Sequence, residues 1–296
     1  MQLVETHIAE EQKKPIRFQE YGVGIFKTIA TKSGLKKGIK KKIIFIDGVL
    51  ATTSKYIFGG EKIELFNADN QPGIKELKLN LKILFEDDYL AIIFKPAGFL
   101  VSGNKLVTIA NGLTHNLKKS KQPDAVKPQP IHRLDYPTSG VLLIGKTSSA
   151  IRNLSQLFEK KERQKIYIAI SVGRMEKTGE IKDLIDEKEA FTAFEVLRTV
   201  TSERFEFLNL VKLKPTTGRK HQLRRHLYSI GNPILGDKEY FLDHKILNGK
   251  GLYLHASSLE FIHPFTKEKL LVTEELPKKF KTIFLDFKQQ KIPKIK

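Results

Sequence analysis

The sequence predicts an α+β fold, with a mixed, largely antiparallel sheet flanked by helices and a small module before it. Three observations support this prediction. The chain has 296 residues, which is more than one small domain usually contains. Its strand-like and helix-like segments do not alternate regularly, as they would in a doubly wound fold. A polar stretch over residues 67–80 separates an N-terminal region from the rest.

The N-terminal region is interpreted as a polar leader over residues 1–20 and a small module over residues 21–66. In the module, a lysine-rich helical segment runs into a strand-like segment, which Asp47-Gly48 ends with a tight-turn signal. Gly59-Gly60 marks a second turn before another strand. This order predicts a helix followed by a hairpin, and it resembles a small RNA-binding module found in a ribosomal protein and in RNA-modifying enzymes.

Residues 67–80 are expected to form a linker because they are polar and contain Gln71-Pro72-Gly73. The main domain is expected over residues 81–287, followed by a basic tail over residues 288–296. Six segments of the core have strand-like apolar patterns: 82–84, 90–94, 141–144, 166–170, 205–213 and 252–254.

Two segments of the core have helical spacing of apolar residues. The first carries Ile151, Leu154, Leu157 and Phe158 on one predicted face. The second carries Leu223, Leu227 and Ile230 as its predicted buried stripe. Gly231 follows where a helix commonly ends with a glycine.

The composition favours a polyanionic partner. Lys and Arg number 52 against 33 Asp and Glu, a net charge of +19, and nucleic acid fits that excess best. A general lysine bias would also explain it. The absence of cysteine excludes disulfides and thiolate chemistry. The N-terminus is polar, and no apolar run is long enough to cross a membrane. Together these features predict a cytoplasmic protein without a membrane partner.

The lysine cluster of the N-terminal module permits two interpretations. Its exposed lysines could form an ordinary solvated helix face, or they could contact the RNA backbone. The residues assigned tentatively to the backbone contact are Lys32, Lys36, Lys37, Lys40 and Lys41.

The segment over residues 131–140 has the pattern of an active-site loop. Asp135 stands two residues after Arg133, among turn-forming residues, and the segment runs directly into an apolar strand. A rigid strand that follows such a loop would hold its side chains in place. From these residues alone, the favoured interpretation is that Asp135 caps a turn, with Arg133 as its ionic partner.

The segment His132-Arg133-Leu134-Asp135, with Thr138-Ser139-Gly140, closely resembles the signature of the RluA-type pseudouridine synthases. Further segments match that family in order, from Lys95-Pro96-Ala97-Gly98 and Lys165-Ile166-Tyr167 to Thr217-Gly218-Arg219-Lys220-His221-Gln222-Leu223-Arg224 and Gly236-Asp237. The resemblance covers most of the chain and implies the pseudouridine synthase fold with a central catalytic cleft. Tyr136-Pro137 depart from the common pattern, so the sequence does not specify the RNA target.

The resemblance implies isomerisation of specific uridines to pseudouridine in ribosomal or transfer RNA. It makes Asp135 the essential carboxylate, Tyr167 the residue that stacks on the base, and Arg224 the ionic partner of Asp135. Strand periodicity agrees, because Tyr167 falls on the face opposite to Ile166 and Ile168. The other residues assigned to substrate binding are Arg133, which would fill the gap left by the flipped base, with His132, Thr138, Arg219, His221 and Gln222.

This chemistry needs no cofactor, and the histidine spacing predicts no metal site, because His221 and His226 are five residues apart. The chain is expected to be monomeric. The alternative interpretation is a catalytically inactive RNA-binding or ribosome-assembly protein with the same fold. A glycoside hydrolase would need a second carboxylate across the cleft, for which Asp237 is the candidate, although its Gly-Asp turn suggests a structural role.

Overall fold

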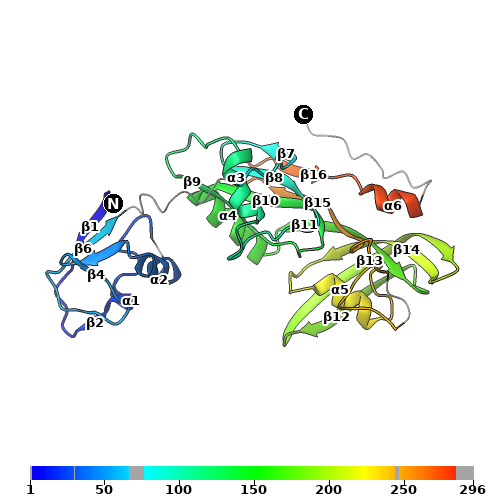
Figure 1. The fold of residues 1–296 in the computed structure, drawn as a ribbon, viewed down its shortest axis with the longest axis horizontal. Helices are drawn as coiled ribbons and strands as arrows, with labels where there is room; N and C mark the ends of the chain where they lie inside the picture. Colours follow the sequence, from blue (N-terminus) through cyan, green and yellow to red (C-terminus); the bar gives the residue numbers. More distant parts are fainter. Residues whose placement is uncertain (1, 30, 67–76, 244–246, 285–296) are drawn as a thin grey trace. The chain divides into compact units, whose positions relative to one another are not determined.

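The computed structural model describes residues 2–29, 31–66, 77–243 and 247–284, and it divides the chain into two compact units, Met1–Lys75 and Glu76–Lys296 (Figure 1). The predicted basic tail and most of the predicted linker lie outside the described residues. The last residues of that linker belong to the second unit, where Leu79 packs against the core. Within the described ranges, no helix is both long and apolar enough to cross a bilayer.

The N-terminal unit, blue in Figure 1, contains a four-stranded sheet in the order β1-β6-β3-β4 and a separate strand pair, β2-β5. Its apolar core includes Phe18, Leu35 and Ile44. The elements are β1 (Leu3–Ile8), β2 (Ile16–Arg17), α1 (Phe18–Tyr21), α2 (Lys32–Lys40), β3 (Ile44–Ile46), β4 (Val49–Leu50), β5 (Tyr56–Ile57) and β6 (Lys62–Phe66).

The predicted helix and hairpin are present in this unit, but the predicted polar leader is wrong. The strands β3 and β4 flank Asp47-Gly48, whose φ angles of 50° and 77° are those of a type I′ hairpin turn. The leader instead contains β1, which pairs antiparallel with β6. Backbone hydrogen bonds hold β1 as an edge strand with mostly exposed side chains, so it has no alternating apolar pattern from which it could be predicted.

The second unit is built on a ten-stranded sheet. Its elements are β7 (Ile83–Glu86), β8 (Leu90–Lys95), α3 (Ile109–Asn116), β9 (Ala125–Pro130), β10 (Ser139–Thr147), α4 (Ser148–Glu159), β11 (Arg163–Val172), β12 (Thr178–Ile185), β13 (Lys188–Ser202), β14 (Glu206–Pro215), α5 (Gln222–Ser229), β15 (Leu254–Ile262), β16 (Lys269–Thr273) and α6 (Lys278–Ile283).

The strand order is β12-β13-β14-β11-β15-β10-β8-β7, with β16 paired to β15 and β9 paired to β10. Among the described strands, only β10 and β15 pair in parallel, so the sheet is mixed and largely antiparallel as predicted. On β10, Leu142 and Ile144 join the larger core, whereas Val141 and Leu143 join a second core beneath α4. Both faces of β10 are therefore covered, which explains its continuous apolar sequence.

The six predicted core strands correspond to β7, β8, β10, β11, β14 and β15, although β15 begins only at Leu254. The prediction did not include β9, β12, β13, β16, α3 or α6. In the second predicted helix, which is α5, Leu223 and Leu227 are buried but Ile230 is exposed. The reason is that α5 ends at Ser229.

Gly231 ends α5 in the predicted way. It has a φ angle of 76°, and its N–H donates to the Tyr228 carbonyl, while the N–H of Asn232 donates to the Leu227 carbonyl. This pair of bonds is the Schellman arrangement, which requires a left-handed residue and so favours glycine. The turn directs the chain towards Asp237, which lies in the candidate site.

Candidate active site

Asp135 lies in the loop between β9 and β10, and its neighbours along the chain alternate between buried and exposed positions. Leu134 is buried in the larger core, while the side chain of Asp135 keeps 29% of its exposure, so an RNA base could reach its carboxylate. The N–H of Thr138 donates to the Asp135 carbonyl over 3.1 Å and closes a turn. Arg133 and Tyr136 are exposed on either side. The loop thus presents one carboxylate between an arginine and an aromatic ring.

Lys95, at the end of β8, fixes this loop from below. It is fully buried, and its Nζ donates to the carbonyls of Pro96, Tyr136 and Thr138 at 3.0, 3.3 and 2.6 Å. Burial lowers the pKa of Lys95 to about 8, while the negative charge of Asp135 acts in the opposite direction. In the sequence, Lys95 belongs to a family motif, but no role is predicted for it. Its signal was a lysine at the end of an apolar strand, where a charge must find partners.

Gly140 allows the loop to join the sheet at the only parallel pairing between the described strands. Its φ angle is 126°, and a Cβ atom there would overlap the Ala256 carbonyl oxygen, so only glycine fits. Beside it, Ser139 Oγ and His255 Nδ1 are 2.9 Å apart, which ties β10 to β15. The Ser-Gly part of the motif is therefore explained by how β10 packs against β15.

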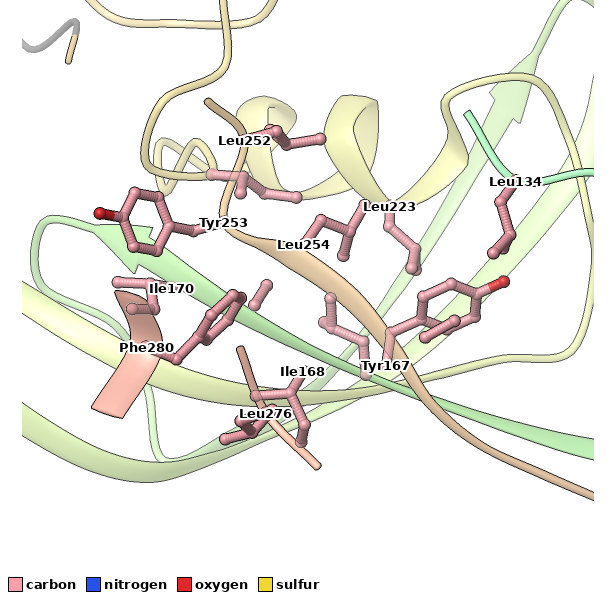
Figure 2. Packing of buried hydrophobic residues seen from close by; sticks show 14 of the residues in the cluster. Leu134, Tyr167, Ile168, Ile170, Leu223, Leu252, Tyr253, Leu254, Leu276 and Phe280 are labelled. Carbon is pink, nitrogen blue, oxygen red and sulfur yellow. The ribbon is translucent and has the colours of Figure 1, made fainter. Parts of the chain in front are cut away.

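Tyr167 on β11 is the second residue of the predicted site. Figure 2 shows its ring near Leu134 and Leu223, on the side of β11 opposite to Ile168. The strand periodicity therefore placed it on the correct face, although the residue is 91% buried and packs within the core. Burial raises the pKa of the Tyr167 hydroxyl, and the nearby charge of Asp135 raises it further. The hydroxyl therefore stays protonated at neutral pH.

Arg224 on α5 does not make the predicted ion pair with Asp135. Its Nε and Nη2 donate to the two carboxylate oxygens of Asp237, each over 2.6 Å, and Nη2 lies 3.3 Å from Glu239. The physical reason is that the backbone N–H groups of Glu239 and Tyr240 hold Asp237 in a turn facing the guanidinium fork. Both charges of the pair are buried, and Asp237 is completely enclosed.

The Arg224 guanidinium still acts on Asp135 through its charge. Burial opposes the charged form, but the bonds to Asp237 and the charges of Asp237, Glu239 and Asp135 together raise the pKa of Arg224. The same geometry excludes Asp237 as the second acid of a glycoside hydrolase, because both of its oxygens are already engaged.

His221 is the residue whose side chain meets Asp135. Its Nε2 lies 3.9 Å from an Asp135 oxygen, and its Nδ1 lies 3.1 Å from the Tyr240 hydroxyl and 3.3 Å from Glu239. Its backbone is left-handed, with φ at 54°, immediately before α5. A left-handed residue that is not glycine is uncommon and concentrates at functional sites. The structure therefore brings together Asp135, Tyr167 and His221, with Arg224 behind them.

The remaining predicted substrate-binding residues divide into exposed and buried ones. Arg133 and Arg219 are exposed. Gln222 is buried, and its amide bonds Phe191, Thr192, Thr217 and Arg219, so no polar group is left for a substrate. The prediction of a direct substrate contact is therefore wrong for Gln222, which shapes the loop before α5 instead.

His132 and Thr138 also support the loop from within. The His132 ring stacks on Phe158 with centroids 4.9 Å apart, and its Nε2 accepts the N–H of Leu143 over 3.2 Å. Burial, together with the positive charges of Lys165 and Arg163, lowers the pKa of His132 to about 3, so it is neutral at physiological pH. Thr138 is 2% exposed. Direct substrate contact does not fit the position of Thr138, whereas contact by His132, which is only partly buried, stays a prediction.

The sequence of the chain is similar to those of known proteins over most of its length. The family model for RNA pseudouridylate synthases matches residues 89–229. The ribosomal large subunit pseudouridine synthase D of Nitrosomonas europaea is 32% identical over 274 residues, or 83% of this chain and 77% of that protein. The tRNA pseudouridine synthase C of Vibrio vulnificus is 32% identical over 235 residues, or 70% of this chain and 95% of that protein.

The chain belongs to the RNA pseudouridylate synthase family. The solved structure of human RNA Pseudouridylate Synthase Domain Containing 4 is 28% identical and has a TM-score of 0.55, covering 67% of this chain and 90% of that one. This likeness confirms the predicted pseudouridine synthase fold. The protein is an isomerase that converts uridine in RNA to pseudouridine, and its partner is RNA.

Proposed function

We propose that this pseudouridine synthase uses Asp135 to isomerise a uridine of ribosomal or transfer RNA without a cofactor. The observation that carries the proposal is the placement of the partly exposed Asp135 carboxylate next to the buried Tyr167, on a loop that Lys95 fixes through three backbone carbonyls. A carboxylate held on a rigid support costs no reorganisation during the reaction.

The reaction breaks the bond between the sugar carbon and N1 of uracil, and then forms a bond between that carbon and C5. The proton on C5 is lost, N1 gains a proton, and no atom is added overall. Asp135 can serve by attacking the sugar or the base, or by stabilising the positive charge that develops on the sugar. Tyr167, with its ring against the loop and a protonated hydroxyl, stacks on the base and exchanges a proton with it.

The target RNA is ribosomal or transfer RNA, since the relatives named above are a ribosomal large subunit enzyme and a transfer RNA enzyme. The protein acts as a monomer in the cytoplasm, where both RNAs are present. Arg133, Arg219 and His221 contact the substrate, because they are the predicted residues that lie at the surface or beside Asp135.

Mapping of pseudouridine with carbodiimide, in total RNA from cells with and without this gene, tests the proposal. We expect one or more uridines in ribosomal or transfer RNA to lose the modification without the gene and to regain it when the wild-type chain is restored. An identical map in both cells would instead favour an inactive RNA-binding protein with this fold.

The lysines of α2 are proposed to contact phosphates of the substrate. Lys36, Lys37, Lys40 and Lys41 are exposed, while Leu35 faces the core of the N-terminal unit. Lys32 differs, because its Nζ pairs with Glu20 at 2.6 Å. The other four lysines form no ion pair with described residues. They lie on the outer side of α2 and at its C-terminal end, where they could contact the phosphates of an RNA backbone.

Replacing Lys36, Lys37, Lys40 and Lys41 together by Gln should weaken RNA binding and leave the rate at saturating RNA unchanged. The plot of log affinity against log salt should become shallower by about 0.7 to 0.9 for each phosphate that a lysine no longer neutralises. Filter binding over a series of KCl concentrations measures this slope. The double variant Lys13→Gln/Lys14→Gln, on a different segment of the same unit, serves as the control. A slope like that of the wild type in the quadruple variant would mean that the cluster is only a solvated face.

A further inference from the structure

Two cations precede Tyr167 on the same face of β11. Arg163, Lys165 and Tyr167 occupy every second position of the strand, so their side chains point to the same side of it. The Arg163 guanidinium lies 5.3 Å and the Lys165 Nζ 6.0 Å from the centroid of the Phe158 ring, on which His132 stacks. Since His132 begins the loop that carries Asp135, this face runs alongside the catalytic loop.

Neither cation has an acidic partner among the residues that the structure describes. Lys165 forms no hydrogen bond or ion pair there. Arg163 donates from Nη2 to the Thr216 carbonyl over 3.2 Å, and its buried Nε has no partner. Burial lowers the pKa of both groups, and the charge of Arg163 helps to lower that of Lys165 to about 8.

Two half-buried, like-charged groups without a counter-ion disfavour the fold. The positive ends of both side chains lie beside the loop that precedes α5. Thr216 of this loop accepts the bond from Arg163, and a Cβ atom on Gly218 would lie 3.7 Å from the Lys165 Nζ. Because Gly218 has no side chain, nothing from that residue covers the ammonium group. The next residue, Arg219, is exposed, and its Nε donates to the Glu189 carbonyl over 3.1 Å.

We propose that Arg163 and Lys165 form a binding site for a phosphodiester group of the substrate RNA, next to the uridine held at Asp135 and Tyr167. The proposal rests on the function proposed above. A phosphodiester supplies the missing negative charge and accepts hydrogen bonds from both the ammonium and the guanidinium. Lys165 and Tyr167 are two positions apart on the strand, so their Cα atoms are about 7 Å apart. A single nucleotide can span this distance. Lys165 is thus a positioning residue that holds the target nucleotide in register.

The test compares wild type, Lys165→Met and Lys165→Arg in the full chain. The substrate is total RNA that carries tritium at C5 of uridine, taken from cells that lack the gene. We expect Lys165→Met to raise KM about ten-fold, the loss of one charge-assisted bond. Its kcat should stay close to that of the wild type, and its salt slope should fall by about 0.7 to 0.9. Lys165→Arg should retain most of the affinity.

Lys267→Met is the control, because it removes the same charge from the turn between β15 and β16, where Nζ bonds the Pro264 carbonyl. The control should keep the wild-type KM and slope. The Met variant at position 165 should melt no lower than the wild type, because it removes an uncompensated charge. A lower melting temperature, or a KM and slope equal to those of the control, would overturn the phosphate site. If the wild type itself released no tritium, the proposed function would fail instead.

Discussion

Asp135→Asn should lower the rate of pseudouridine formation by about 10⁴-fold or more, the scale seen when an essential reacting group is removed. The amide keeps the shape of the side chain but carries no negative charge, so it can neither attack nor stabilise a cation. The fold should be unaffected, because Lys95 holds the loop through the backbone carbonyls of Pro96, Tyr136 and Thr138 and not through the carboxylate. RNA affinity should therefore stay near that of the wild type.

Release of tritium from C5 of uridine measures this rate directly, because the new carbon–carbon bond displaces that hydrogen. Asp186→Asn is the matched control, since Asp186 lies at the surface in an ion pair with Arg225 at 2.9 Å. The control should react at the wild-type rate. Turnover by Asp135→Asn within ten-fold of the wild type would rule out the assignment of Asp135. Release of free uracil by the wild type would indicate hydrolysis in place of isomerisation.

Arg224→Met should destabilise the protein by about 3 to 5 kcal/mol, the cost of removing one partner from a buried pair. The cause is Asp237, whose enclosed carboxylate would lose both hydrogen bonds from the guanidinium. Activity should fall as well, because Asp135 would lose the positive charge behind it. Urea unfolding and tritium release measure the two effects separately.

The double variant Arg224→Met/Asp237→Asn separates stability from activity. Its neutral amide removes the buried charge, while the amide oxygen can still accept the N–H groups of Glu239 and Tyr240. We expect most of the lost stability to return and the activity to stay low. A single variant as stable as the wild type would contradict the importance of the pair, and a fully active double variant would show that Arg224 does not act on Asp135.

The strands with continuous apolar sequences could be predicted from the local sequence. The apolar runs at β8 and β10 are continuous because both sides of the sheet are covered there, and such runs are visible in the sequence. By contrast, β1 is held largely by backbone pairing to β6, far along the chain, while β12 pairs with β13, and β13 also with β14, all neighbours in sequence. Most of the side chains of these strands are polar or half-exposed, and few positions are buried, so no regular pattern of apolar residues revealed them.

The sequence by itself determined the family, the fold class and the candidate carboxylate, because short contiguous motifs carry them. Asp135, the face of Tyr167 and the end of α5 at Gly231 follow from neighbouring residues and strand or helix periodicity.

Only the tertiary structure decided which charges meet. In the structure, Arg224 pairs with Asp237, and His221 lies next to Asp135. Lys95 binds the backbone carbonyls of the loop that carries Asp135. The physical reason is that an ionic partner is chosen by distance and burial between segments far apart in the chain, and spacing along the sequence contains neither quantity.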